Sequence, residues 1–258
     1  MILRKKYAPF FLAMAMSATY TSIAKDNTLT NSILVKVKKD SVKGIYYSLH
    51  VIWEGLKLKE YNLSDLEKFR KQNKHFNIIH HISPLYLINS SERKRFKEKF
   101  LKAYKEGDVI GIYLNSWKKI IEESGLDFRR KISFWGNELP TDCQKCGSEI
   151  SLLSYKTSEL ETIVEWTIEQ VDNLGFGSPT VSFVAGWQSS PKLLEILSSN
   201  GIKVDFSMIA PYRTAKTLNH MNIYQLLLDN WGYQSESLAP TAKQFSKTKI
   251  FQIPNNFA

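Results

Sequence analysis

Short runs of apolar and β-branched residues alternate along this chain with longer segments in which apolar residues recur every three or four positions. The apolar runs predict buried strands at 45–52, 77–82, 109–114, 180–184 and 204–208. The periodic segments predict helices at 63–72, 90–104, 158–174 and 191–199, with a further helix that begins over 117–123. Strands that alternate with helices at this spacing favour a parallel α/β sheet or barrel.

The stretch 129–151 has no clear period, so it is predicted to be a loop excursion. It contains Cys143 and Cys146, the two cysteines of the chain. A single Cys-x-x-Cys pair supplies half of a four-cysteine zinc site, and no second pair exists. In an exported protein the two thiols can close a local disulfide, which we favour over a redox or metal role.

The first residues have the features of a signal peptide. Arg4, Lys5 and Lys6 form a positive region, and an apolar run at 7–18 is too short to span a bilayer. Small residues at positions 22 and 24, in Ser-Ile-Ala, then predict cleavage before Lys25. We therefore expect a signal peptide at 1–24, a single mature domain at 25–258 without a membrane span, and a periplasmic or secreted location. A buried N-terminal helix is the alternative.

The length of 258 residues and the hydrophobic content of 43% suit one domain with a full core. Loss of the signal peptide lowers the net charge from +10 to +7, because that segment carries three cations and no acid. The basic clusters at 36–39 and 93–95 contain no interleaved aromatic residues, so no nucleic-acid partner is expected. Attraction to anionic cell-wall polymers and a plainly solvated surface are the remaining interpretations.

Several segments in the predicted strands carry a family resemblance. Residues 48–55 are similar to a strand that ends in Asp-Trp/Phe-Glu-Gly, and residues 107–117 to a strand that carries His-x-His-x-Trp. Residues 176–187, with the helix and strand that follow to 207, are similar to a third motif that contains Ser-Phe-Arg-Ala-Gly-Gly-Trp. Residues 80–86 are similar to His-Phe-Leu-Asn-Pro-Ala-Tyr. In this order the segments resemble the motifs of polysaccharide deacetylases, carbohydrate esterase family 4.

This resemblance implies the irregular (β/α) barrel of that family, with the site where the carboxyl ends of the strands meet. It also implies hydrolysis of N-acetyl groups on an N-acetylglucosamine-type polysaccharide. The reaction needs a divalent metal such as zinc, held by one carboxylate and two imidazoles, with an aspartate as base and a later histidine as acid. Members of the family usually continue beyond the point where this chain ends, so a shortened C-terminus is expected.

This sequence has other residue types at the metal and catalytic positions. Ile52 stands at the aspartate, Tyr113 and Asn115 stand at the two histidines, and Val184 or Phe183 stands at an arginine that orients a carboxylate. The later histidine has no obvious counterpart. We therefore expect a deacetylase-like pseudoenzyme without a cofactor, which acts by binding a glycan, a cell-wall polymer or a protein partner. The sequence does not indicate its oligomeric state.

A divergent metal-dependent hydrolase, with zinc in a relocated site, is the alternative. His50, Glu54 and the pair His80 and His81 lie near the predicted strand ends and could assemble such a site. Side chains alternate across a strand, so only one of His80 and His81 can face the barrel interior. Capped or hydrogen-bonded histidines are the plainer interpretation.

Four aromatic residues next to the motif positions are candidates for stacking on sugar rings. They are Trp53, Tyr86, Trp117 and Trp187. Aromatic faces suit this role, but ordinary core and loop packing is an equally good interpretation of the same residues.

Export gives the first testable prediction. If cleavage occurs before Lys25, N-terminal sequencing of the secreted or periplasmic protein should begin Lys-Asp-Asn. Recovery of the protein in the cytosol with Met1 intact would contradict the signal peptide.

Overall fold

The computed structural model describes residues 14–19, 46–54, 58, 60–131, 133, 138–143, 146–147, 149–184, 190–208, 243–244 and 251–254. Its strands are β1 (Met14–Thr19), β2 (Tyr46–Trp53), β3 (Ile78–Ile82), β4 (Val109–Leu114), β5 (Val181–Val184), β6 (Val204–Met208), β7 (Lys243–Gln244) and β8 (Phe251–Pro254). Its helices are α1 (Glu60–Gln72), α2 (Ser90–Phe100), α3 (Lys118–Glu123), α4 (Thr157–Asp172) and α5 (Pro191–Ser199), with 3-10 turns η1 (Pro84–Tyr86) and η2 (Leu152–Ser154).

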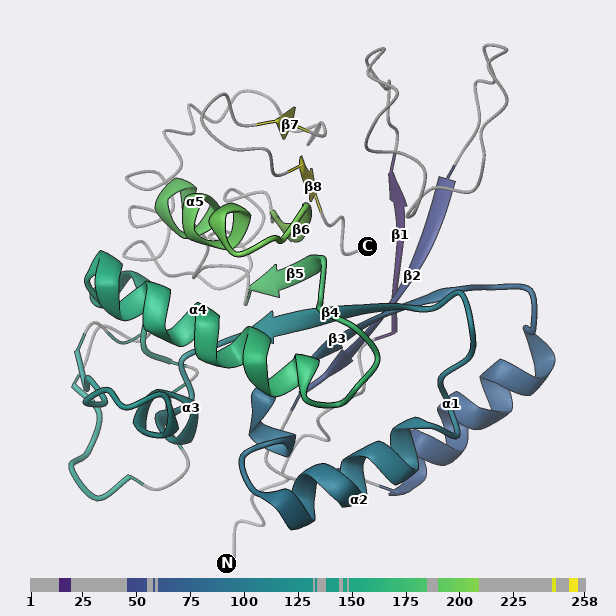
Figure 1. Cartoon of the computed structure of the whole chain (residues 1–258), viewed down its shortest axis with the longest axis horizontal. Helices are drawn as coiled ribbons and strands as arrows, with labels where there is room; N and C mark the ends of the chain where they lie inside the picture. The colour runs from purple at the N-terminus through teal and green to yellow at the C-terminus, as the bar shows by residue number, and fades with distance from the viewer. Residues whose placement is uncertain are drawn as a thin grey trace, which may run out of the picture.

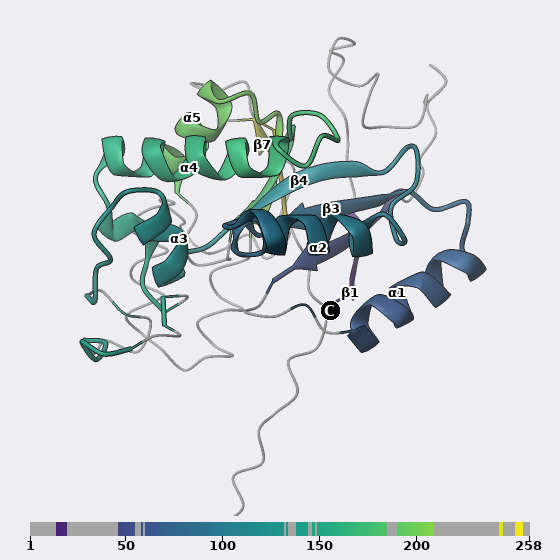
Figure 2. The ribbon, with the colours of Figure 1, turned by 60° about the horizontal axis from the view of Figure 1, so that its bottom comes forward.

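One sheet joins the strands in the order β1-β2-β3-β4-β5-β6-β8-β7. Strands β2 to β6 are parallel and follow one another in chain order. These five strands curl into a half-barrel (Figure 1). Crossovers of one hand place the connecting helices on one side, and Figure 2 shows α1, α2 and α4 along the same side of the sheet. The predicted α/β class with a parallel sheet is confirmed.

Antiparallel strands flank the sheet at both ends, where β1 pairs with β2 and β7 pairs with β8. Strand β1 falls within the predicted signal peptide, and the rest of that segment lies outside the described residues. Cleavage before Lys25 would remove β1 and uncover the edge of β2. Within the described residues, no helix is long and apolar enough to cross a membrane.

The observed elements follow the predicted ones closely in the half-barrel. Strands β4 and β6 and helix α5 have the predicted bounds, whereas helix α1 begins earlier than predicted, at Glu60. Helix α2 ends at Phe100 and not at Tyr104, because the chain turns after Phe100 and the N–H of Ala103 bonds back to the Phe100 carbonyl at 2.9 Å. The apolar spacing continues through this turn, but Leu101 is exposed.

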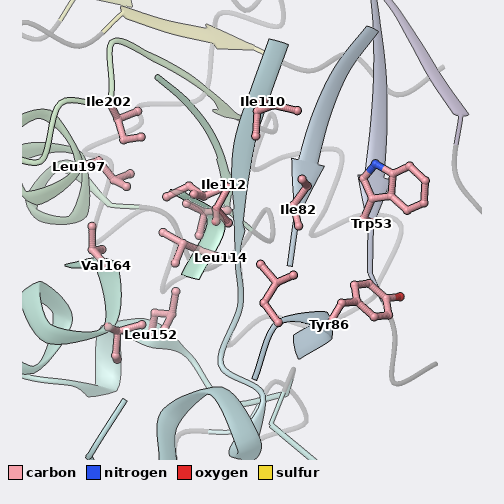
Figure 3. Packing of buried hydrophobic residues seen from close by; sticks show 14 of the residues in the cluster. Trp53, Ile82, Tyr86, Ile110, Ile112, Leu114, Leu152, Val164, Leu197 and Ile202 are labelled. Carbon is pink, nitrogen blue, oxygen red and sulfur yellow. The ribbon is translucent and has the colours of Figure 1, made fainter. Parts of the chain in front are cut away.

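Both faces of the half-barrel are buried, as near-continuous apolar strands require. The larger cluster fills the space between the sheet and the helices and includes Trp53, Ile82, Tyr86, Ile110, Ile112, Leu114, Leu152, Val164, Leu197 and Ile202 (Figure 3). A second cluster lies on the concave face and contains Ile79, Tyr113, Val181, Phe183 and Phe206. Side chains that follow one another along a strand therefore alternate between the concave face and the face covered by helices, and this alternation decides on which face each candidate site residue lies.

The excursion after α3 is anchored to the end of β4. The hydroxyl of Ser116 lies within hydrogen-bond reach of the carbonyls of Gly147 and Ile150, and the N–H of Lys118 donates to the Cys146 carbonyl at 3.0 Å. Gly147 has φ +138°, and a Cβ there would collide with the backbone of residues 116–118, so this approach requires glycine. Cys143 and Cys146 are joined as a disulfide, with 5.8 Å between their Cα atoms.

A buried carboxylate holds the amino ends of β3 and β4 together. The Asp108 side chain has no exposed surface and accepts hydrogen bonds from the N–H groups of Ile78 at 2.9 Å and Lys105 at 3.0 Å. It also contacts Nε2 of His80 at 3.1 Å and forms an ion pair with Arg70. Burial alone would raise the pKa of Asp108, but the hydrogen bonds from His80 and the two backbone groups lower it instead.

Arg70 extends this network to two further segments. Its Nε donates to the Ala103 carbonyl at 3.0 Å and its Nη1 to the Phe76 carbonyl at 2.7 Å. One guanidinium from α1 therefore fixes the turn after α2 and the loop before β3. We name Asp108, Arg70 and His80 the carboxylate clamp.

The clamp gives the second prediction. Asp108→Ala should lower the free energy of unfolding by about 3–5 kcal/mol, because it leaves the buried Arg70 without its counter-charge. Asp65→Ala is the matched control, since its pair with Lys68 is exposed on both sides and should contribute less than about 1 kcal/mol. Urea unfolding of both variants measures the difference, and equal small losses would contradict a central role for the clamp.

Candidate functional site

The candidate site lies where β2 and β4 end at the same edge of the sheet. Glu54 follows β2, and Asn115 follows β4. Nδ2 of Asn115 donates to Oε1 of Glu54 at 3.2 Å, and the phenol of Tyr113 lies near enough to this carboxylate to lower its pKa. We name Glu54, Tyr113, Asn115 and Trp117 the rim cluster.

The cluster is built around one carboxylate with neutral donors. Much of the Glu54 side chain is exposed, yet its carboxyl lies among Tyr113, Asn115 and Trp117. Desolvation raises the pKa of Glu54, and hydrogen bonds from these neighbours oppose that rise.

Asn115 is fully buried, and its amide has a defined orientation. The nitrogen donates to Glu54, whereas Oδ1 of Asn115 has no partner among the described residues. Trp117 is half-buried and lies close enough to Glu54 to lower the pKa of the carboxyl. Its Nε1 makes no hydrogen bond to a described residue, so its contact with Glu54 is weaker than that of Asn115.

Tyr113 is held as a neutral phenol. Burial raises its pKa well above the usual value, and the charge on Glu54 and the hydrogen bond to Glu54 act in the same direction. A protonated phenol donates a hydrogen bond and is a poor metal ligand. Tyr113 therefore serves here as a donor to Glu54.

The other positions of the family motifs, Ile52, Val184 and Phe183, are apolar and add no polar group to the rim cluster. Ile52 is half-buried and packs with the concave cluster. Val184 is fully buried in the larger core, on the opposite face of β5 from Phe183. Phe183 lies on the concave face, with its ring centroid 5.8 Å from that of Tyr113. An apolar ring thus occupies the concave position next to Tyr113.

The three histidines of the proposed relocated metal site lie on different faces. Nδ1 of His50 and Nε2 of His81 are 2.9 Å apart on the concave side, where both rings contact Phe206. His80 points to the helix side, where it accepts from the Trp53 indole at 3.1 Å. Among the described residues, no group of three His, Cys, Asp or Glu side chains is placed to hold a metal ion.

The four candidate stacking residues differ in accessibility. Trp53 is 3% exposed and packs edge-on against Phe96 and Phe100 within the core (Figure 3). Tyr86 is 8% exposed and stacks on Phe96, although it lies near enough to Glu54 for the carboxylate to raise its pKa after the larger effect of burial. These positions favour core packing for both rings. Trp117 is half-buried at the rim, and Trp187 lies outside the described residues.

The sequence pattern did not indicate that Tyr113 and Asn115 lie against Glu54. A signal was present, because Glu54 is two positions beyond Ile52 and so continues the concave face of β2. Comparisons with protein-family models, with curated proteins and with solved structures gave no match.

The buried histidines give the third prediction, on stability against pH. Desolvation lowers the pKa of His50 to about 4 and lowers the pKa of His80 and His81 as well. Below the unfolded value of 6.5 the unfolded chain binds more protons, so the free energy of unfolding should fall as the pH falls. At pH 5 the contribution lost through His50 alone is about 2 kcal/mol.

Urea unfolding at pH 7.5 and pH 5 measures this effect. His50→Gln should reduce the pH dependence, whereas His75→Gln, at an exposed histidine, should leave it unchanged. An unfolding free energy that does not change between the two pH values would contradict neutral buried histidines.

Proposed function

We propose that this chain is an exported relative of polysaccharide deacetylases, with an irregular (β/α) barrel, that binds a glycan at the rim cluster without metal-dependent hydrolysis. The half-barrel and the position of the cluster at the carboxyl edge of parallel strands support this proposal. The expected site of action is the periplasm or the exterior of the cell.

The contact between Asn115 and Glu54 carries the proposal. At the two positions where the family motif has imidazoles, β4 supplies neutral donors that hold a carboxylate at an exposed edge. A carboxylate held in this way keeps lone pairs for the hydroxyl groups of a sugar. The half-buried indole of Trp117 adds an apolar surface beside it.

The residue types at the family's metal-ligand positions argue against metal-dependent hydrolysis by this chain. Ile52 has no lone pair, and the raised pKa of Tyr113 keeps its oxygen protonated. The Asn115 amide directs its nitrogen at Glu54. Loss of three ligand positions removes the tight binding of metal and the lowered pKa of metal-bound water that the hydrolysis needs.

Binding measurements give the fourth prediction. N-acetylglucosamine oligomers titrated into the purified protein should bind, and Glu54→Gln should weaken the affinity about tenfold, the size of one hydrogen bond to a charged group. Glu98→Gln, at an exposed position of α2, changes the net charge equally and should have no effect.

The outcomes separate binding from catalysis. Oligomer binding without acetate release in the presence of zinc supports the proposal. Acetate release that a chelator abolishes would favour the alternative, a divergent metal-dependent N-acetyl hydrolase. Absence of binding by a panel of cell-wall glycans would contradict a glycan partner at this site.

A further inference from the structure

A pocket with a volume of about 420 Å³ lies in the excursion after α3 and is lined by Arg129, Arg130, Lys131, Glu138 and Ser154. In Figure 1 the excursion lies beside α3, below α4. None of these lining residues belongs to the rim cluster, so the pocket is a separate feature of the molecule.

The first cation of the pocket is rigidly placed. Nη2 of Arg129 donates to Glu159 at 2.7 Å, and its guanidinium lies 4.8 Å from the centroid of the Tyr155 ring. The backbone N–H of Arg129 also donates to the Tyr155 hydroxyl at 3.1 Å. Arg129 is therefore fixed against the start of α4 and contributes a stationary positive charge.

The other two cations already hold a carboxylate that belongs to the chain. Arg130 contacts Oε1 of Glu138 at 2.7 Å, and Lys131 contacts Oε2 at 3.0 Å. Each carboxylate oxygen thus has its own cation, and the hydrogen bond from Lys131 lowers the pKa of Glu138. Glu138 is exposed, so another carboxylate can take its place without a buried group being uncovered.

Ser154 supplies an independent indication of a ligand. Ser154 lines this pocket, and its Oγ is buried and has no hydrogen-bond partner among the described residues. An unpaired buried hydroxyl is unfavourable until a polar atom reaches it. A ligand that carries a hydroxyl or carboxylate oxygen would provide that atom.

We propose that this pocket binds a small organic carboxylate, of the class of sugar acids, whose carboxylate replaces that of Glu138 between Arg130 and Lys131 and whose neighbouring oxygen reaches Ser154. The three cations exceed the two acids Glu138 and Glu159 by one, so the pocket attracts an anion even before Glu138 leaves. This site does not depend on glycan binding at the rim cluster.

The test, which is the fifth prediction, is a titration of the full chain with sodium glucuronate at low ionic strength, where ion pairs are least screened. Binding should saturate, and Arg130→Gln or Lys131→Gln should weaken it about tenfold, the effect of losing a charge-assisted hydrogen bond. Ser154→Ala should weaken it about threefold without changing the charge.

Glu138→Gln should act in the opposite direction and strengthen glucuronate binding about tenfold, because it removes the internal competitor. A gain in affinity cannot result from misfolding. The matched control is Glu161→Gln, an exposed residue of α4 outside this pocket, which should leave the affinity within about twofold.

Three results would overturn the proposal. The first is the absence of saturable binding. The second is an equal gain from Glu138→Gln and Glu161→Gln, which would reveal general charge attraction. The third is tighter binding of inorganic phosphate than of glucuronate, which would refute the assignment of a carboxylate.

Discussion

The carboxylate of Asp108 is buried at the point where α1, β3, β4 and the turn after α2 meet. It contacts Arg70 of α1, Ile78 and His80 of β3, and Lys105 after α2. A buried charge is tolerated only when its partners are in place, so the packing of each of these segments depends on the others. The bond from Ile78 aligns the start of β3 with the start of β4. The rim cluster lies at the carboxyl ends of β2 and β4. The register that Asp108 sets at the amino ends of β3 and β4 therefore also determines the geometry of the rim cluster.

Register matters here because side chains alternate across each strand. A slip of one residue would exchange the environments of His80 and His81, although the two are adjacent in the chain. In the observed register His81 meets His50 on the concave side, whereas His80 joins Asp108 on the helix side. The same alternation directs Tyr113 to the concave face, from which it reaches Glu54. The register that the clamp fixes therefore places His80 on the helix side, apart from His50 and His81 on the concave side.

Apolar runs and helical periods predicted most of the half-barrel, because burial on both faces leaves a clear pattern in the sequence. The end of α2 was predicted wrongly, since the helical spacing of apolar residues continues to Tyr104 while the chain turns at Phe100. That turn places the Ala103 carbonyl on Arg70, a contact between residues far apart in sequence. The bond between Glu54 and Asn115 is of the same kind. Strand ends indicated which residues share an edge, but local patterns do not encode which side chains bond across it.

The two candidate sites each present a carboxylate of the chain, and the nature of its partners separates their chemistry. At the rim, neutral donors from β4 converge on Glu54, which directly follows β2. Neutral donors add no positive charge, so this site retains the acceptor character of the carboxylate and suits a ligand rich in hydroxyl groups. In the excursion, Arg130 and Lys131 neutralise Glu138, whose own side chain is exposed. Displacement of Glu138 leaves two unpaired cations, so that pocket suits an anion. A glycan with both hydroxyl and carboxylate groups contains the chemistry that each site favours.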